Sequence, residues 1–275
     1  MVNLQGKVIL ITGASRGLGR AMAEGLAEAS ANLVLTARRG SDARLAEVVH
    51  SIVHRGAQGE MLEILGDVAN PEDCETIIRE TRERFGTLDV LINNAGIGMD
   101  LIGPLKANNR QFYNIPVDIW RRIVDTNING IFLMARAAMP LFLSQRRGRI
   151  INVTTSYVTM LKPGFCPYGP SKAAAEAMTV IWAKELAGTG IMVNSLSPGA
   201  GVDTSLMPAE DWPDRSKLLP VSVMVPAAVW LSSDESEGIT GMRIVGKDWN
   251  TALPPAQAFK GASSRVAIAD EKPQN

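Results

Sequence analysis

The sequence predicts a single-domain α/β fold in which helices flank both faces of a doubly wound parallel β-sheet. Six short apolar runs, rich in Val, Ile and Leu, indicate strands that are buried on both faces, as in a parallel sheet. Longer amphipathic stretches alternate with these runs, which favours right-handed βαβ units of the Rossmann-like type. The 275 residues contain no internal repeat and no Gly/Ser-rich linker, so we expect one domain.

The expected elements follow one another along residues 1–250. Strands are predicted at residues 7–12, 32–36, 61–65, 88–92, 149–153 and 191–196. Helices are predicted at residues 17–29, 43–54, 71–85, 117–144, 169–187 and 226–232. The helix start at Asn70-Pro71 is the clearest, because asparagine caps helices and proline suits the first helical position. Residues 251–275 have the composition of a loosely held C-terminal tail.

The composition argues against several classes of protein. Lys plus Arg and Asp plus Glu both number 28, and a zero net charge disfavours nucleic-acid binding. No stretch reaches the ~18–20 apolar residues of a membrane helix, so no membrane contact is expected. Two cysteines cannot form a disulfide framework, which predicts a reduced, cytoplasmic protein. His50 and His54 lack a third ligand candidate, and no metal site is predicted.

A glycine-rich turn follows the first predicted strand and opens the first predicted helix. Glycine permits positive φ angles and close approach of the backbone to a pyrophosphate, which a helix N-terminus attracts. Dinucleotides bind at the first βα unit of this fold class, so the turn is a candidate binding loop, with a plain structural turn as the alternative. Its candidate residues are Gly13, Ser15, Arg16, Gly17, Leu18 and Gly19.

The end of the second strand indicates which dinucleotide binds. An acidic residue there would bind the adenosine ribose 2′-hydroxyl, and the sequence has Arg38 and Arg39 instead. Together with Arg16 of the loop, these side chains can bind a 2′-phosphate. Three solvated surface arginines are the alternative. The sequence therefore favours NADP(H) over NAD(H).

One of the three tyrosines, Tyr168, is followed four residues later by a lysine, Lys172. On a helix these two side chains share a face. A surface tyrosine beside a solvated lysine is the alternative for this spacing taken alone.

Further short motifs accompany the loop and the Tyr-Lys pair in a fixed order along the chain. They are Asp67-Val68 and Asn93-Asn94-Ala95-Gly96 after the third and fourth strands, Asn127, Asn194, Pro198-Gly199 with Val202-Asp203-Thr204, and Thr240-Gly241. The ordered set spans residues 6–249 and resembles the short-chain dehydrogenase/reductase family. The resemblance implies hydride transfer between NADP(H) and a small carbonyl or secondary-alcohol substrate, and a homodimer or homotetramer.

The resemblance also implies a role for each matching residue. Tyr168 would be the general acid that protonates a carbonyl oxygen, with its pKa of ~10 lowered by Lys172, which would also bind the nicotinamide ribose. Asn127 would hold a water molecule in a proton relay. The adenosine side would be lined by Asp67, Val68, Asn94, Ala95 and Gly96, and the nicotinamide side by Pro198, Gly199, Val202 and Thr204.

The chain departs from the family pattern at the fourth catalytic position. The family has a serine thirteen residues before the tyrosine, and here Thr155 stands at that position, followed by Ser156. Threonine keeps the hydroxyl but adds a methyl group and a stiffer χ1. Because successive strand residues point to opposite faces, we predict that Thr155, and not Ser156, faces the substrate.

Two segments are candidates for the substrate side. The connection at residues 97–116 is longer than usual for the family and is either a surface excursion or part of the substrate wall. Residues 205–223, with Met207 and Trp212 as predicted substrate contacts, stand where the family carries a mobile lid; the lid region extends over about residues 200–225. Trp212 is either an apolar anchor of that lid or a hydrophobic plug.

The leading prediction is an NADP(H)-dependent ketone reductase or alcohol dehydrogenase. The alternative is a non-catalytic NADP(H)-binding regulator on the same fold, which only Thr155 favours. The presence of Tyr168, Lys172 and Asn127 together argues against that alternative.

Overall fold

In this computed structural model, residues 2–103, 110–207 and 209–267 are described, and within them eight strands form one sheet. The strand order is β3-β2-β1-β4-β5-β6-β7-β8. Strands β1 to β7 are parallel, and β8 pairs antiparallel with β7 at the edge. The predicted doubly wound sheet is confirmed. The strands are β1 (Val8–Thr12), β2 (Asn32–Ala37), β3 (Met61–Leu65), β4 (Val90–Asn93), β5 (Gly148–Val153), β6 (Ile191–Ser197), β7 (Met242–Val245) and β8 (Ser263–Arg265).

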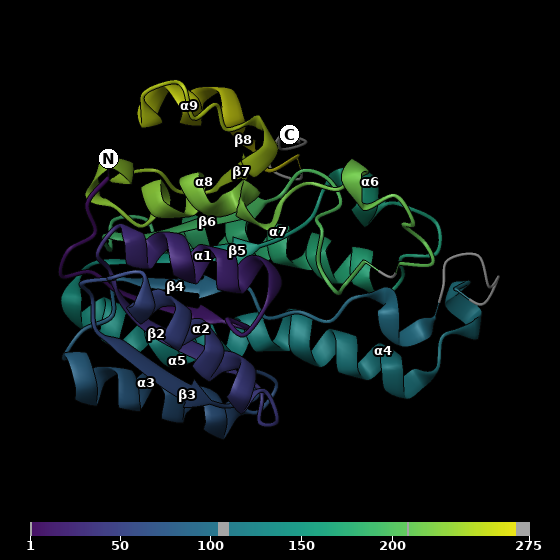
Figure 1. Cartoon of the computed structure of the whole chain (residues 1–275), viewed down its shortest axis with the longest axis horizontal. Helices are drawn as coiled ribbons and strands as arrows, with labels where there is room; N and C mark the ends of the chain where they lie inside the picture. Colours follow the sequence, from purple (N-terminus) through teal and green to yellow (C-terminus); the bar gives the residue numbers. More distant parts are fainter. Residues whose placement is uncertain (1, 104–109, 208, 268–275) are drawn as a thin grey trace, which may run out of the picture.

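Helices cover both faces of the sheet (Figure 1). One face packs against α1, α2, α8 and α9, and the other against α3, α5 and α7. Among the described residues, no helix has both the length and the apolar character needed to cross a membrane. The helices are α1 (Gly17–Glu28), α2 (Asp42–His54), α3 (Pro71–Phe85), α4 (Val117–Val124), α5 (Gly130–Gln145), α6 (Tyr157–Met160), α7 (Tyr168–Glu185), α8 (Val225–Leu231) and α9 (Pro255–Ala262).

The continuous apolar runs of the strands follow from this two-sided burial. In β1, Ile9 and Ile11 pack into the cluster that contains α1 and α2. Val8 and Leu10 of the same strand pack into the opposite cluster, with α3 and α5. Since alternate residues point to opposite faces, a strand covered on both sides must be apolar at every position.

The order of the strands fixes where a ligand can bind. The chain runs outward from β1 through β2 to β3 and then returns to β4 on the other side of β1. The loops that leave β1 and β4 therefore diverge, and a crevice opens between them at the carboxyl ends of the strands. The glycine-rich loop follows β1, and Asn94 to Gly96 follow β4.

The helix predicted at residues 117–144 is present, but it contains an irregular turn. A π-helical turn, η4 (Asp125–Asn129), joins α4 to α5. Asn127 lies in this turn and is fully buried. π-Helical turns are common at functional sites, because the extra residue re-aims a side chain.

The prediction of a loosely held tail from residue 251 is wrong for the segment that includes α9 and β8. In α9, Ala258 and Ala262 are buried, and β8 adds an antiparallel strand to β7. Beyond β8, Val266 is buried, and the backbone N–H of Ala267 donates to the Tyr157 hydroxyl at 3.0 Å. Small residues such as alanine carry much of this packing, and they give little apolar periodicity for the sequence to reveal.

Candidate active site

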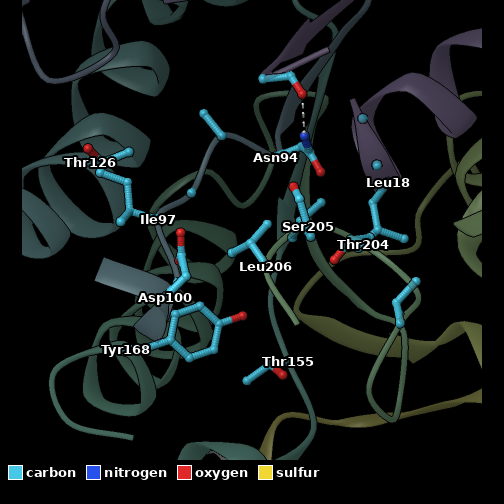
Figure 2. Close-up of a pocket in the computed structure, with 18 of the residues that line it drawn as sticks. Leu18, Asn94, Ile97, Asp100, Thr126, Thr155, Tyr168, Thr204, Ser205 and Leu206 are labelled. Atoms are coloured by element: carbon cyan, nitrogen blue, oxygen red, sulfur yellow. Dashed lines mark hydrogen bonds between the residues drawn. The ribbon is translucent and has the colours of Figure 1, made fainter. Parts of the chain in front are cut away.

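A cleft of about 590 Å³ lies over the carboxyl ends of the parallel strands. The loops that follow β1, β2, β3 and β4 line one part of it, and α6, the start of α7 and residues 198–207 line another. Figure 2 shows Leu18 and Asn94 at one end of this cleft and Thr155 and Tyr168 at the other. The structure therefore joins the predicted cofactor residues and the predicted catalytic residues in one space.

The glycine-rich loop after β1 is shaped by close backbone contacts. Gly13 and Gly17 have positive φ angles of 68° and 55°. A Cβ atom on Gly19 would lie 2.3 Å from the Gly13 carbonyl oxygen, so only glycine fits there. The Asn94 side chain donates to the carbonyl oxygens of Thr12 and Gly13 at 2.9 and 3.1 Å. Asn94 lines the cleft as predicted, and it also fixes the shape of this loop.

The N-terminus of α1 points its backbone N–H groups into this loop without a side-chain cap. Arg16 at the capping position makes no capping hydrogen bond, and the first turn carries no acidic residue. An uncapped N-terminus beside a glycine cradle is suited to a pyrophosphate. The residues present thus fit the dinucleotide predicted from the sequence.

Only two of the three arginines predicted to form a cluster line the cleft in the structure. Arg16 and Arg38 line the cleft, but Arg39 does not. Arg39 instead binds both carboxylate oxygens of Asp73 at the start of α3, at 2.6 and 2.8 Å, and this pairing lowers the Asp73 pKa. Arg44, one turn into α2, takes the third position: it lines the cleft and donates to the Ser41 hydroxyl at 2.9 Å.

Three of the predicted catalytic side chains lie together where β5 ends and α7 begins. Tyr168 and Lys172 are on the first turns of α7, and Figure 2 shows Thr155 close to the Tyr168 ring. The Lys172 Nζ donates to the Val153 carbonyl oxygen at 2.9 Å and lies 5.9 Å from the centroid of the Tyr168 ring. All three line the cleft.

Burial controls the pKa values of the Tyr-Lys pair. Burial raises the Tyr168 pKa, and the hydrogen bond from Thr155 partly offsets that effect. Burial also lowers the Lys172 pKa to about 8. The expectation that Lys172 holds the Tyr168 pKa below ~10 is therefore not met in the protein alone. The physical reason is that Tyr168 is itself buried, and desolvation penalises its charged phenolate form.

Asn127 is buried behind the cleft rather than in its lining. Its side-chain oxygen accepts from the Ile97 N–H at 2.8 Å, and its amide nitrogen donates to the Ile97 carbonyl at 3.0 Å and to the Ser171 hydroxyl at 3.1 Å. A Cβ atom on Gly96 would lie 3.5 Å from both the Asn127 oxygen and the Lys172 Nζ. Both groups thus border one small space, and the predicted water relay stays a prediction.

Of the remaining predicted cofactor residues, all but one line the cleft. Asp67, Val68, Ala95 and Gly96 line the cleft. Pro198, Val202 and Thr204 line it near the glycine loop, where the Thr204 methyl group would lie 3.2 Å from a Cβ atom on Gly17. Gly199 does not line the cleft, because its positive φ of 90° turns it against Val245 and Lys247.

The substrate side is enclosed by two segments that meet across the cleft. Met99, Asp100 and Leu101 line it, so this first part of the connection at 97–116 is wall, whereas Phe112 and Tyr113 are exposed and lie outside the lining. Figure 2 shows Asp100 beside Tyr168, with Leu206 from the predicted lid close by. A buried ion pair at 3.3 Å, Arg110 with Asp211, links the two segments.

The predicted lid residues both reach the cleft. Met207 and Trp212 line it, and the Lys162 Nζ lies 5.4 Å from the Trp212 ring centroid. Trp212 is thus a wall residue of the lid. Sequence reasoning missed Lys162, Phe165 and Arg110, which also line the cleft. No local spacing marks them, because loops that meet only in the folded protein bring them there.

Comparisons with known proteins show which proteins the chain is similar to. A model of the short chain dehydrogenase family matches residues 7–213. A 3-oxoacyl-[acyl-carrier-protein] reductase from Synechocystis is 33% identical over 259 residues, which cover 94% of this chain and 96% of that protein. An uncharacterized oxidoreductase from Staphylococcus saprophyticus is 36% identical over 81% of this chain and 90% of its own. The crystal structure of a short-chain type dehydrogenase/reductase from Mycobacterium marinum superposes with a TM-score of 0.77 at 30% identity, covering 88% of this chain and 94% of that one.

Proposed function

Because the chain belongs to the short chain dehydrogenase family, we propose that it interconverts a carbonyl compound and a secondary alcohol with NADP(H) as the hydride carrier. The observation that carries this proposal is the group formed by Thr155, Tyr168 and Lys172, placed in one cleft with the uncapped N-terminus of α1. The similarity to 3-oxoacyl-[acyl-carrier-protein] reductases supports reduction of a carbonyl as the direction.

The proposed chemistry assigns one task to each side chain. Bound NADPH would supply the hydride. The Tyr168 hydroxyl, kept protonated by its raised pKa, donates its proton to the carbonyl oxygen, and the Thr155 hydroxyl donates a hydrogen bond to the same oxygen. The Lys172 ammonium stabilises the phenolate that remains. Asn127, whose side-chain oxygen borders the same space as the Lys172 Nζ, would return a proton through water.

The test is NADPH oxidation in the presence of ketones, quinones and 3-oxoacyl thioesters. Turnover of at least one carbonyl class is expected. Tight binding of NADPH with no turnover of any class would favour the non-catalytic regulator instead. The cytoplasmic location inferred from the composition stays a prediction.

Cofactor choice is expected to depend on Arg38. The Arg38→Asp substitution should weaken NADPH binding relative to NADH by about tenfold or more, since a hydrogen bond to a charged group contributes ~1.5–3 kcal/mol and would be replaced by repulsion. The measurement is the ratio of the two dissociation constants, obtained from nucleotide fluorescence titrations.

A matched pair of variants distinguishes the arginine that lines the cleft from the arginine that does not. Arg38→Gln should lower the preference for NADPH, whereas Arg39→Gln should leave it unchanged, because Arg39 is paired with Asp73 outside the cleft. Equal binding of NADPH and NADH by the wild-type protein would contradict the proposed cofactor preference.

We also propose a homodimer or homotetramer formed through α4–α5 and α7. Phe132 and Ile181 on these helices are about half exposed, at 48% and 52%, which supports burial against another copy. Light scattering at micromolar concentration should give a dimer or tetramer. Phe132→Glu should shift the mass toward the monomer, and Val53→Glu on α2, where the wild-type side chain is 61% exposed, should not. A monomeric wild-type protein would contradict this proposal.

A further inference from the structure

A buried ion pair lies directly behind the candidate catalytic group. Glu176 on α7 and Arg243 on β7 form it, with side chains only 1% and 3% exposed. The Glu176 carboxylate also accepts hydrogen bonds from the hydroxyls of Thr154 at 2.7 Å and Ser195 at 2.9 Å. All parts of this cluster lie within the sheet and its covering helix, outside the cleft lining except for Thr154.

The arginine of this pair holds the backbone of the predicted catalytic threonine. The Arg243 Nη2 donates to the Thr155 carbonyl oxygen at 2.8 Å, and Nη1 lies 3.3 Å from the Thr154 hydroxyl. The Tyr157 ring covers the guanidinium, with 4.1 Å between its centroid and the guanidinium carbon. One side chain thus contacts three of the four residues that follow β5.

The glutamate belongs to the same face of α7 as the catalytic pair. Tyr168, Lys172 and Glu176 are spaced four residues apart, so they lie in one row along the helix. Lys172 donates to the Val153 carbonyl oxygen, and Glu176 accepts from the Thr154 hydroxyl. The helix that carries Tyr168 therefore holds the two residues that directly precede Thr155.

Thr155 needs such support because it lies beyond the end of β5. The N–H of Thr154 still donates to Leu196 of β6, at 2.9 Å, but the ladder of paired residues between β5 and β6 ends at Val153. The Thr155 carbonyl is bound by the guanidinium instead. Threonine has a stiff χ1, so the direction of its hydroxyl follows the position of its backbone.

A buried ion pair is a poor source of stability, since the desolvation of both charges offsets most of their attraction. Its value here is geometric: planar, bidentate guanidinium bonding fixes two partners at once. We propose that Arg243 and Glu176 are positioning residues, which fix the Thr155 backbone so that its hydroxyl meets the Tyr168 hydroxyl and the substrate oxygen. The catalytic part of this inference rests on the proposed function.

The main test replaces Arg243 by lysine, which keeps the charge opposite Glu176 but loses the planar pair of donors. We expect kcat for reduction of a 3-oxoacyl thioester or of the best ketone in the panel to fall roughly ten- to hundredfold, as for a misplaced catalytic group. The dissociation constant for NADPH should not change. Arg149→Lys is the matched control, because Arg149 is also buried on a strand but pairs with Glu237 at the opposite end of β5.

A double-variant comparison distinguishes positioning from a general structural defect. In a Thr155→Val background, the Arg243→Lys substitution should cause little further loss of kcat, because the hydroxyl that it positions is gone. An equal loss of kcat in both backgrounds would overturn the proposal. Glu176→Gln keeps the side-chain length and should act in the same direction as Arg243→Lys, which provides a second variant if the first does not fold.

A measurement without substrate keeps this inference separate from the proposed function. The chain has three tyrosines, so the ζ-carbon of ¹³C-labelled Tyr168 can be followed by NMR after assignment with Tyr→Phe variants. Arg243→Lys and Thr155→Val should both shift this signal in the same direction, since one displaces and the other removes the Thr155 hydroxyl close to Tyr168, and Arg149→Lys should not. An unmoved Tyr168 signal in Arg243→Lys would overturn the positioning role, even if the wild-type protein reduces carbonyl compounds.

Discussion

The Tyr168→Phe substitution is expected to leave the protein folded and able to bind NADPH while removing nearly all carbonyl reduction. Only the phenolic hydroxyl is lost, and the volume of the ring is kept, so the packing around α7 should survive. General acid catalysis contributes ~10²–10⁴-fold, and a loss of this size in kcat is expected. Steady-state kinetics, with NADPH binding and thermal unfolding measured in parallel, checks the prediction.

Tyr113 offers a matched control for this variant. Its side chain is 71% exposed and lies outside the cleft lining, so Tyr113→Phe should keep full activity. If Tyr168→Phe retained more than about a tenth of the wild-type rate, Tyr168 would not be the general acid, because that role accounts for at least ~10²-fold.

The Thr155→Val substitution is expected to lower turnover by roughly 10²-fold or more, as for the loss of one donor to a developing oxyanion. Valine keeps the branched shape of threonine and removes only the hydroxyl, which lines the cleft close to Tyr168. Thr155→Ser should keep activity, because the hydroxyl remains. Rates for the three proteins with one carbonyl substrate give the comparison.

Ser156 is the matched control for Thr155. The Ser156 hydroxyl accepts from the Thr159 N–H at 3.1 Å and caps α6, so it has a structural role. Ser156→Ala should therefore cost about 1 kcal/mol of stability, as for a lost N-cap, with little change in turnover. An inactive Ser156→Ala protein with an active Thr155→Val protein would mean that the thirteen-residue spacing identified the wrong hydroxyl.

Much of the fold could be predicted because the signals are local. The strands β1, β2 and β4 are almost continuous apolar runs. The helix start at Asn70-Pro71 is present with its cap, since the Asn70 side chain accepts from the Asp73 N–H. The ends of a strand are set by its hydrogen-bonded pairing with a neighbouring strand and not by the strand preference of its residues. The sequence predicts a strand that starts at residue 88, but β4 begins at Val90, which pairs with Ile9 of β1. The edge strand β8 escaped prediction because its three residues, Ser-Ser-Arg, have no strand preference.

In the candidate site, too, residues that belong to a local motif could be predicted, and residues that only the fold brings together could not. Residues within one motif, such as Tyr168 and Lys172, could be recognised from their spacing together with the ordered set of other motifs, and they do lie together. Arg39 was misplaced because its partner, Asp73, is 34 residues away, and the sequence cannot say which acid an arginine will meet. Arg44 was missed because nothing in its own surroundings distinguishes it from a solvated helix arginine. Glu176 and Arg243 are 67 residues apart and become neighbours only through the order of strands β5, β6 and β7.

The contact between Ala267 and Tyr157 has a consequence for the time at which the site is completed during synthesis. Tyr157 covers Arg243, and its hydroxyl is bound by the backbone of Ala267, beyond the strand β8 that pairs with β7. A nascent chain on the ribosome can therefore assemble β1 to β6 and the nucleotide loop while the support behind Thr155 is still missing. The part of the cleft proposed to bind the dinucleotide can therefore form before Thr155 is held in position. A protein shortened before Ala267 would keep the Arg243–Glu176 pair but lose the hydrogen bond that holds the Tyr157 ring over Arg243.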